Sequence, residues 1–561
     1  MKKNSIPIED STITSIALII AIFVFVKNCW ITEDAYILFR CIEQLFAGHG
    51  PIWNPHERVQ VFTSPLWLGI LSITRFFSKD LYLNTIFISF VLWILTLFNF
   101  KKLLSNSLSF LVTVLFCVSS TALYDFTSSG LENVLGYFLV STFLILYFDV
   151  NLHNNGTNTK KIPPHDCQAK HKHQKLKTIL SNSKQNQIIA LMVISGMTVC
   201  TRLDYATLFF LPTIYIAAKN VKTFSIKQWV VIFALSGLPF LGWTLFSILY
   251  YGFPFPNTAY AKLDTGIDHS LILQQGIKYF FESFRNDSIT LLPIAAVISL
   301  MFSRRVSRYI KPLILGILLN LFYIVYVGGD FMQGRFLSYA YLFSVLIIVF
   351  INKQNKRIIY LLLFAIALYL SAYPHTPLNS PFDYTYKKIF NGVADERGHY
   401  FKETSLYSYI SKKPKKLFPN HPWSYQGVEF QHADKKVESF GNIGIFGYYT
   451  GVNKIIIDPT ALSDPLLSRL PVPGRWRIGH FLRKIPDGYL ETLATGRNLI
   501  KDPYIKKYYN KLKIITQSEK LFDLRRLKTI FLFNIGSYKN LLVKSKNLSL
   551  HSVKKKGCGG S

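Results

Sequence analysis

Charged residues are scarce in this sequence. Only 17% of its 561 residues are charged, whereas soluble proteins of ordinary composition carry about a quarter. Apolar residues make up 50%, and they gather in blocks that reach or approach the roughly 20 residues of a transmembrane helix. These features exclude a single soluble domain and a disordered or fibrous chain. They predict a polytopic membrane protein.

Cysteine is also too rare and too scattered to form a scaffold. The chain has six cysteines and no Cys-x-x-Cys pair, which excludes a disulfide framework and a structural zinc site. Cys29 and Cys41 flank one predicted outer loop and could pair, but two free thiols are the simpler expectation.

Acidic residues are outnumbered by basic ones, 31 to 63, for a formal net charge of +32. In a soluble protein this excess would suggest a nucleic-acid partner. No recognisable nucleic-acid-binding module accompanies the charge here. Lys and Arg collect in cytoplasmic loops and face anionic headgroups, so we expect the lipid bilayer as the partner and no nucleic acid.

Twelve apolar blocks predict the membrane topology of residues 1–373. They lie near residues 13–30, 62–78, 82–100, 107–123, 131–149, 188–201, 205–218, 229–251, 289–303, 310–327, 337–351 and 358–373. The basic linkers between blocks are expected on the cytoplasmic side, and this is possible only if one early block does not cross. The short, proline-bearing block 62–78 is interpreted as re-entrant or juxtamembrane. About eleven crossings remain, with the N-terminus inside.

The segment 151–187 carries seven lysines against one aspartate and has little apolar content. This composition predicts a solvated, flexible cytoplasmic linker. His165, His171 and His173 within it could bind a metal ion, but a plain basic loop is the favoured interpretation.

The same topology places residues 374–561 outside. This tail is long enough for its own core. It mixes a strand-like run at 454–458 (KIIID) with turn signals and Lys-rich helices, which predicts a small α/β domain. Its 32 basic residues against 14 acidic ones suit an anionic membrane or polymer surface.

Polar residues gather near helix ends on the predicted outer face, while the helix middles are nearly free of charge. The ionisable groups of a transporter are expected near the midplane, so this pattern favours an interfacial active site over a lipid-linked sugar flippase. Two further interpretations stay open: loop residues that merely cap helices, and a non-catalytic envelope scaffold. The residues are Glu33, Asp34, Arg40, His49, Arg58, Glu132, Arg202, Asp204, Asn257, Lys262, Asp330 and Arg335.

An outward-facing group transferase needs a donor carried on a lipid, because nucleotide-activated donors are cytoplasmic. A sugar on polyprenyl phosphate meets this need, and its leaving group is a phosphate. The enzyme must then supply a general base for the acceptor hydroxyl and cations for the departing phosphate. Carboxylates and cations are both present on the predicted face.

The first outer loop (31–67) contains a set of familiar motifs. They are Glu33-Asp34, Arg40, Gly48-His49-Gly50, Asn54-Pro55, Glu57-Arg58 and Thr63 to Trp67. This loop resembles that of the mycobacterial terminal β-(1→2)-arabinofuranosyltransferase (AftB-like) family and its Gram-negative relatives, within the GT-C glycosyltransferase superfamily. The departures are Glu33 for the commoner Asp, His56 for the usual Gly and Leu203 for Pro.

Further motifs continue the resemblance nearly from end to end, outside the 151–187 segment and the last 60 or so residues. They are SSGLEN (128–133), TRLDY (201–205), YGFPFPNTAYAK (251–262), GGDFMQGRF (328–336), ADERGHY (394–400), IDPTALSDPLLSRLP (457–471) and WRIGHFLRKIPDGYLE (476–491).

The resemblance implies a GT-C transmembrane catalytic domain over 1–373, with 31–61 as its first outer loop, and a C-terminal periplasmic domain over 374–561. It implies inverting transfer of arabinofuranose or a similar pentose, at the outer face of the bacterial inner membrane, from polyprenyl phosphate to a cell-envelope glycan. A protein- or lipid A-directed GT-C enzyme is the nearest alternative.

By the same resemblance, Asp34 is the expected general base. Glu33 would orient the acceptor or a divalent cation such as Mg²⁺, Mn²⁺ or Ca²⁺, although many GT-C enzymes with single-phosphate donors function without one. The alternative for an adjacent acidic pair is an ordinary helix N-terminus.

The remaining assignments concern substrate contacts. Arg202, Lys262 and Arg335 are candidate ligands of the donor phosphate, or else snorkelling interfacial cations. Asp204 and Asp330 are expected to hold these cations in place, and Glu132 and Asn257 to contact sugar hydroxyls. His49 would shuttle a proton or be structural, and Arg40 and Arg58 belong to the first-loop motif. The tail residues expected to dock the tail or bind the acceptor are Asp395, Arg397, Asp464 and His480. Asp458 and Asp464 flank a turn, so capping is their simplest role.

Overall fold

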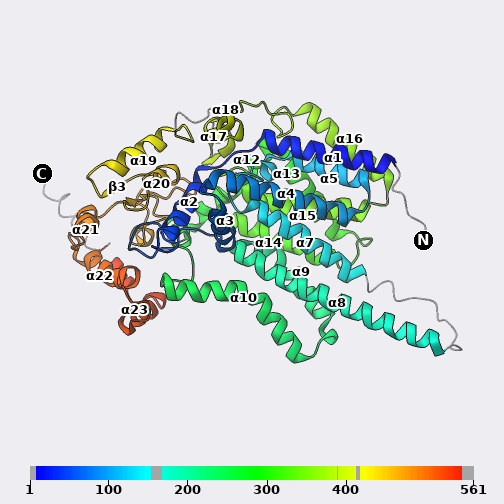
Figure 1. The fold of residues 1–561 in the computed structure, drawn as a ribbon, viewed down its shortest axis with the longest axis horizontal. Coiled ribbons are helices and arrows are strands. Elements are labelled where there is room, and N and C mark those ends of the chain that lie inside the picture. Colours follow the sequence, from blue (N-terminus) through cyan, green and yellow to red (C-terminus); the bar gives the residue numbers. More distant parts are fainter. Residues whose placement is uncertain (1–7, 153–166, 264, 388, 412–416, 546–561) are drawn as a thin grey trace. The chain divides into compact units, whose positions relative to one another are not determined.

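The computed structural model describes residues 8–152, 167–263, 265–387, 389–411 and 417–545 (Figure 1). The chain is mostly helical and divides into two compact units. Unit 1 comprises residues 1–30, 82–241 and 273–401, and unit 2 comprises 31–81, 242–272 and 402–561. The first outer loop thus packs with the tail, whereas the sequence placed it in the 1–373 domain.

Unit 1 is a helical assembly with one short hairpin. All twelve predicted apolar blocks are helical, and eleven lie wholly or largely in this unit. Its helices are α1 (Ile8–Lys27), α4 (Leu81–Leu104), α5 (Ser107–Ser119), α6 (Thr121–Tyr124), α7 (Asn133–Leu152), α8 (Cys167–Thr201), α9 (Ala206–Lys219), α10 (Ile226–Tyr250), α12 (His269–Asn286), α13 (Ser288–Ser299), α14 (Lys311–Tyr326), α15 (Ser338–Asn352), α16 (Lys356–Ala372) and the start of α17 (Glu396–Thr404). Strands β1 (Ile389–Phe390) and β2 (Val393–Ala394) pair antiparallel.

Fewer helices than predicted are long enough to cross a membrane. Among the described residues five qualify by length and composition, or six if the bent pair α12–α13 is one span. This pair turns by 113°. The sequence counted about eleven crossings because apolar blocks such as those of α5 and α14 pass a composition test. The 13 and 16 residues of these helices are short of a straight span.

The predicted flexible linker 151–187 is partly helical. Its C-terminal part belongs to α8, which begins at Cys167 and runs without interruption to Thr201. Residues 153–166, which include His165, lie outside the described residues, and so do the side chains of His171 and His173. The four described cysteines, Cys29, Cys41, Cys117 and Cys200, are buried free thiols.

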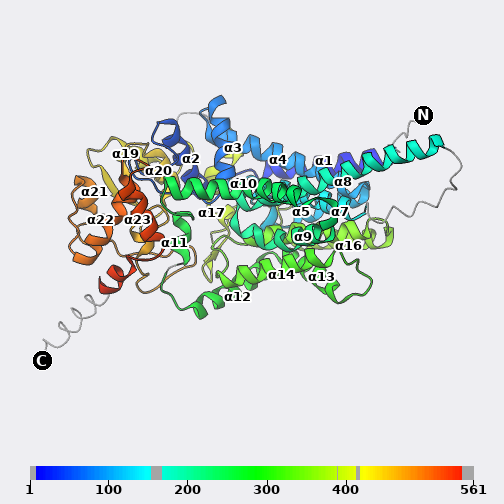
Figure 2. The same ribbon diagram turned by 90° about the horizontal axis from the view of Figure 1, so that it is seen from below.

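Helices α9 and α14 pack closely in unit 1 (Figure 2). Gly316 on α14 makes this approach possible, since a Cβ there would lie 2.3 Å from the carbonyl oxygen of Leu208 on α9. Small residues let helix backbones approach in this way in membrane proteins.

Unit 2 has a core of its own under several short helices. Its elements are α2 (Glu33–Phe46), α3 (Pro65–Phe77), α11 (Asn257–Leu263), α18 (Leu406–Ser411), α19 (Pro422–His432), α20 (Ile443–Tyr449), α21 (Tyr489–Thr495), α22 (Pro503–Gln517), α23 (Leu524–Asn534), β3 (Val437–Ser439) and β4 (Ile455–Ile457). The two strands pair in parallel, with Val437 opposite Ile455. The strand predicted from KIIID is confirmed as β4. The core joins Ile457, Leu466, Tyr489, Leu512 and Ile530.

Replacement of Gly316 by Ala is expected to lower the unfolding temperature of the detergent-solubilised protein. The added methyl group must separate α9 from α14, and overpacking of this kind costs about 1–3 kcal/mol. The matched control is Gly69→Ala on α3, where a Cβ meets nothing within 4 Å. An equal loss in both variants would contradict the close packing at Gly316.

Candidate functional site

The acidic pair opens α2, and its two carboxylates lie in different surroundings. Glu33 is 5% exposed, whereas Asp34 is half-buried. The Ile445 backbone N–H donates to Glu33 Oε1 at 3.1 Å, and Gly444 contributes a second backbone contact. Burial, and then the neighbouring charge of Asp34, raise the pKa of Glu33 to about 8. Glu33 is therefore engaged with α20, and Asp34 is the more accessible acid.

Glycine is required where α20 meets Glu33. A Cβ on Gly444 would lie 2.1 Å from the Glu33 carbonyl oxygen and 2.7 Å from its Oε1. The contact depends on a residue 411 positions away, and any side chain at Gly444 would push α20 from α2.

Arg40, two turns along α2, holds the same helix to the segment after α20. Its guanidinium donates to the carbonyl oxygens of Trp53 at 3.0 Å, Gly451 at 2.6 Å and Lys454 at 2.8 Å, and also to that of Gly447. Its Cζ lies 4.8 Å from the Trp53 ring centroid. Burial lowers the pKa of Arg40 to about 9. Arg40 therefore has a structural role in fixing α2.

The acidic pair is not part of a larger group of metal-ligating side chains. Among the residues that the structure describes, no three His, Cys, Asp or Glu side chains are placed to hold a metal ion. A divalent cation at Glu33 and Asp34 stays a prediction, because Mg²⁺ can be held by two carboxylates together with substrate phosphate. No step below is routed through one.

The other first-loop residues make local contacts in unit 2. His49 Nδ1 lies 2.6 Å from Gln44 Oε1, which agrees with a structural histidine. Arg58 donates to the Ser518 carbonyl.

Two further predicted residues of unit 2 lie outside the first loop. Lys262 is exposed in the last turn of α11, and His480 is half-buried.

Asn257 binds the 458–470 segment with its whole amide. Its Nδ2 lies 3.0–3.1 Å from the carbonyl oxygens of Ala461, Leu462 and Asp464, and its Oδ1 accepts from Ser468 at 2.9 Å. The amide that the sequence assigned to a sugar hydroxyl is thus engaged with protein.

Asp458 and Asp464 cap turns, as their simplest interpretation predicts. Asp458 accepts from the backbone of Thr460 and Leu462, each at 2.7 Å, and Asp464 accepts from Leu466 at 2.9 Å. Burial raises the pKa of each to about 6.

A second set of predicted residues comes together in unit 1. Arg202, which follows α8, forks onto Asp204, with Nε–Oδ1 at 2.8 Å and Nη2–Oδ2 at 3.0 Å. Its Nη1 donates to Glu132 Oε1 at 2.7 Å. Glu132, predicted to contact sugar, therefore pairs with an arginine instead.

Arg335 approaches the same carboxylate more loosely. Its Nη2 lies 3.6 Å from Glu132 Oε1, and its Nη1 lies 3.6 Å from Asp330 Oδ2. Although burial opposes ionisation, Arg202 and Arg335 together lower the pKa of Glu132. Gly334 positions Arg335: its φ is 70°, and a Cβ there would lie 2.5 Å from that of Ala122.

This arginine cluster combines two guanidiniums with three carboxylates. The pairing of Arg202 by Asp204 agrees with the expectation that the aspartates hold the cations. Arg202 is already committed to two carboxylates at hydrogen-bond distance. Arg335, whose ion pairs are longer, is the cation of the cluster that a phosphate could engage with less rearrangement.

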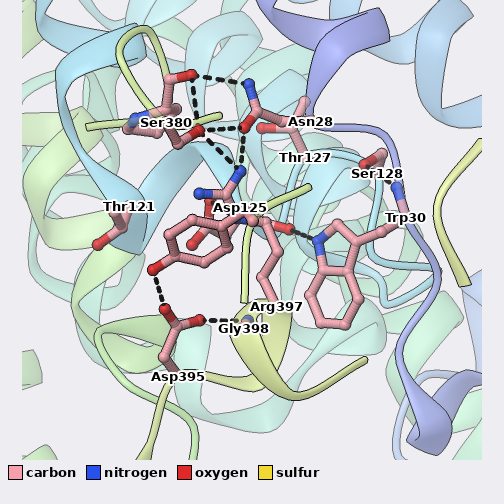
Figure 3. A network of polar contacts seen from close by, with 12 residues as sticks. Asn28, Trp30, Thr121, Asp125, Thr127, Ser128, Ser380, Asp395, Arg397 and Gly398 are labelled. Carbon is pink, nitrogen blue, oxygen red and sulfur yellow. Dashed lines mark hydrogen bonds and ion pairs between the residues drawn. The ribbon is translucent and has the colours of Figure 1, made fainter. Parts of the chain in front are cut away.

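A third network includes tail residues that the sequence assigned to docking or acceptor binding (Figure 3). Arg397 is 1% exposed, and its Nε lies 3.0 Å from Asp125 Oδ1. It also donates to Asn28 Oδ1, and its Cζ stacks 4.1 Å from the Tyr384 ring centroid. Asp395 accepts from Tyr384 and from the Gly398 backbone at 2.8 Å. Both residues thus lie in the interior of unit 1.

Sequence reasoning missed the partners of Arg397. Burial raises the pKa of Asp125, against the opposing charge of Arg397. Trp30 donates its indole N–H to the Asp125 carbonyl at 2.7 Å. Asp125 stands three residues before the SSGLEN motif, but no local pattern marks it as the counter-ion of a residue 272 positions away.

Two curated proteins are similar to this chain. One is the terminal β-(1→2)-arabinofuranosyltransferase of Mycobacterium tuberculosis, 23% identical over 87% of this chain and 86% of that protein. The other is the protein of the same name from Corynebacterium glutamicum, 26% identical over 58% of this chain and 48% of that protein. No protein-family model and no solved structure matches the chain. The family resemblance predicted from the motifs is confirmed.

Removal of one partner from the Asp125–Arg397 pair is expected to destabilise unit 1. Arg397→Met leaves the Asp125 carboxyl buried without its cation, a change that costs about 3–5 kcal/mol. The double variant Asp125→Asn/Arg397→Met should lose less than the sum of the single changes, as measured by unfolding in detergent. Strict additivity would show that the pair does not interact.

The stability of unit 2 is expected to fall as pH rises. Burial raises the pKa of Glu57 to about 8, from an ordinary value near 4.5. Between these values the folded state holds a proton that the unfolded state has released, so each such group lowers stability by up to about 1.4 kcal/mol per pH unit.

Glu57→Gln should therefore flatten the fall in unfolding temperature between pH 5 and pH 8. The exposed Glu491→Gln serves as the control. The interpretation is wrong if both variants keep the slope of the unchanged protein.

Proposed function

We propose that this chain is an integral-membrane inverting glycosyltransferase. It transfers a pentose, arabinofuranose or a similar sugar, from a polyprenyl-phosphate donor to a hydroxyl of a cell-envelope glycan. The reaction takes place at the outer face of the bacterial inner membrane, with residues 374–561 on the periplasmic side. Support comes from the two similar arabinofuranosyltransferases and from the helices long enough to span a membrane.

One observation supports the choice of base: the two adjacent carboxylates have different surroundings. A general base must be accessible and must accept a proton at the working pH. Glu33 is buried and bonded to α20, and burial together with the charge of Asp34 raises its pKa, which favours the protonated form. Asp34, half-exposed in the first turn of α2, is the carboxylate that we assign as the base.

The proposed reaction is a single displacement. The acceptor hydroxyl oxygen attacks the anomeric carbon while the bond from that carbon to the phosphate oxygen breaks. Asp34 takes the hydroxyl proton, and polyprenyl phosphate leaves with the electron pair of the broken bond. Positioned cations stabilise the charge that develops on the phosphate. Lys262, which belongs to unit 2 as Asp34 does, is our candidate for this role.

The test is sugar transfer from radiolabelled polyprenyl-phosphate arabinose in membranes that contain the full chain. Asp34→Asn should reduce transfer by roughly 10²–10⁴-fold, the usual contribution of a general base. Glu33→Gln keeps the size and the acceptor oxygen of a neutral Glu33, so it should retain most of the activity.

The reverse result, loss in Glu33→Gln and retention in Asp34→Asn, would contradict the assignment. Transport of the lipid-linked sugar without transfer, unaffected by Asp34→Asn, would instead indicate a flippase. Transfer to protein or lipid A in place of glycan would preserve the reaction and replace the acceptor.

A further inference from the structure

Unit 2 contains a small pocket, partly open to solvent, that no role above uses. It is formed by the first-loop segment 58–60, the segment 251–260, the start and end of the Pro465–Arg469 turn and the end of α22. Among the described residues, no acidic one lines it. The lining residues are Arg58, Val59, Gln60, Tyr251, Phe253, Phe255, Asn257, Tyr260, Pro465, Arg469 and Thr516.

Arg469 is held rigidly at this pocket. Its Cζ lies 4.1 Å from the Phe253 ring centroid and 4.7 Å from that of Tyr260. One nitrogen, Nη1, donates to the Pro465 carbonyl at 2.7 Å and to Asn257 Oδ1 at 3.2 Å. Within the described part of the chain, Nε and Nη2 make no hydrogen bond. The guanidinium is thus fixed in place with donors still available.

Arg58 reaches the same pocket from the first loop. Its Nη2 donates to the Ser518 carbonyl, and its Cζ lies 5.9 Å from the Tyr250 ring centroid. Its Nε is buried and has no hydrogen-bond partner in the residues that the structure describes. Burial lowers the pKa of Arg58, and the Tyr250 hydroxyl offsets only part of this decrease.

The two arginines differ from the arginines of unit 1 described above. Arg202, Arg335 and Arg397 each lie within 4.0 Å of a carboxylate. Across the described residues, neither Arg58 nor Arg469 forms an ion pair. Partly buried cations are costly unless they are paired, so an anion bound here would satisfy two guanidiniums at once.

We propose that this pocket binds an oxyanion of the phosphate type through Arg58 and Arg469. Guanidinium presents a planar fork of N–H donors that matches phosphate and carboxylate geometry. The rings of Phe253, Tyr260 and the 45%-exposed Phe255 offer apolar faces to the part of the ligand that carries the anion.

Two molecules could supply this anion. Only this identification of the source rests on the proposed function. One is the phosphate of the polyprenyl-phosphate donor, and the other is an anionic group on the glycan acceptor. The pocket chemistry is the same for both.

The first experiment measures binding of ³²P-labelled inorganic phosphate to the purified full chain in detergent. Arg58→Gln and Arg469→Gln should each weaken binding by about tenfold or more, since hydrogen bonds to charged groups are among the strongest. Arg475→Gln removes an exposed arginine of the same unit and should leave binding unchanged. Neutral arabinose should not compete.

The proposal is overturned if Arg58→Gln binds phosphate as the unchanged protein does, or if Arg475→Gln weakens binding equally. Arg469 also supports the fold through Asn257 and the Pro465 carbonyl. Phosphate binding by Arg469→Gln is therefore compared with that of the unchanged protein only if the two unfold at the same temperature. Arg58→Gln, on a different segment, decides the matter if Arg469→Gln fails to fold.

Steady-state transfer then identifies the source. A raised KM for the lipid donor alone in Arg58→Gln indicates the donor phosphate, and a raised KM for the acceptor alone indicates an anionic glycan. If no lipid-phosphate sugar is transferred at all, the proposed function fails while the phosphate-binding result still stands.

Discussion

Buried charge must find a partner, and this constraint organises both units. Arg40 donates to four carbonyl oxygens, and Arg397 forms an ion pair with Asp125 and donates to Asn28. Each contact joins chain segments that are far apart in sequence: Arg40 and Gly447 are separated by 407 positions. Since a buried ion without its partner costs several kcal/mol, these contacts fix which segments pack together inside each unit. The apolar helices make up most of the packed structure, and the polar contacts determine how these segments are arranged within each unit.

Burial also separates the roles of the two residues in the acidic pair. Glu33 enters the interior and is matched by the N–H groups that begin α20, which fixes the first turn of α2. Asp34, the next residue along that turn, remains half-exposed. The Glu33 carboxylate therefore holds the start of α2 in place, and the Asp34 carboxylate remains accessible. Arg40 adds to this by holding α2 two turns further along.

Local patterns in the sequence were sufficient to predict the helices and the strand, but not the long-range contacts that their side chains make. The twelve apolar blocks were all found as helices, and KIIID as β4, because hydropathy and β-branching act over a few neighbouring residues. The acidic pair lies at a helix start, as the alternative interpretation of the pair expected. The count of about eleven crossings stays a prediction: five or six of the described helices are long and apolar enough to cross, and α5 and α14 are shorter apolar helices.

The candidate site shows the same division. Motifs singled out Arg202, Asp204, Glu132 and Arg335, but grouped Glu132 with Asn257 and the two arginines with Lys262; the structure joins the four. The motifs did not show that Glu132 is the shared counter-ion, nor that Gly444 receives Glu33. Arg469 was passed over because an arginine in a turn carries no local mark of its function. Its open donors become visible only once Phe253, Tyr260 and Asn257 are placed around it.

The pH dependence of kcat/KM for sugar transfer, in the unchanged protein and in Glu33→Gln, tests the central claim most directly. The profile reports the ionisation of the essential base in the free enzyme. If Asp34 is the base and Glu33 is structural, the acidic limb of the profile should be the same in both proteins. A limb centred near pH 8, matching the pKa of Glu33, that disappears in Glu33→Gln would contradict the account.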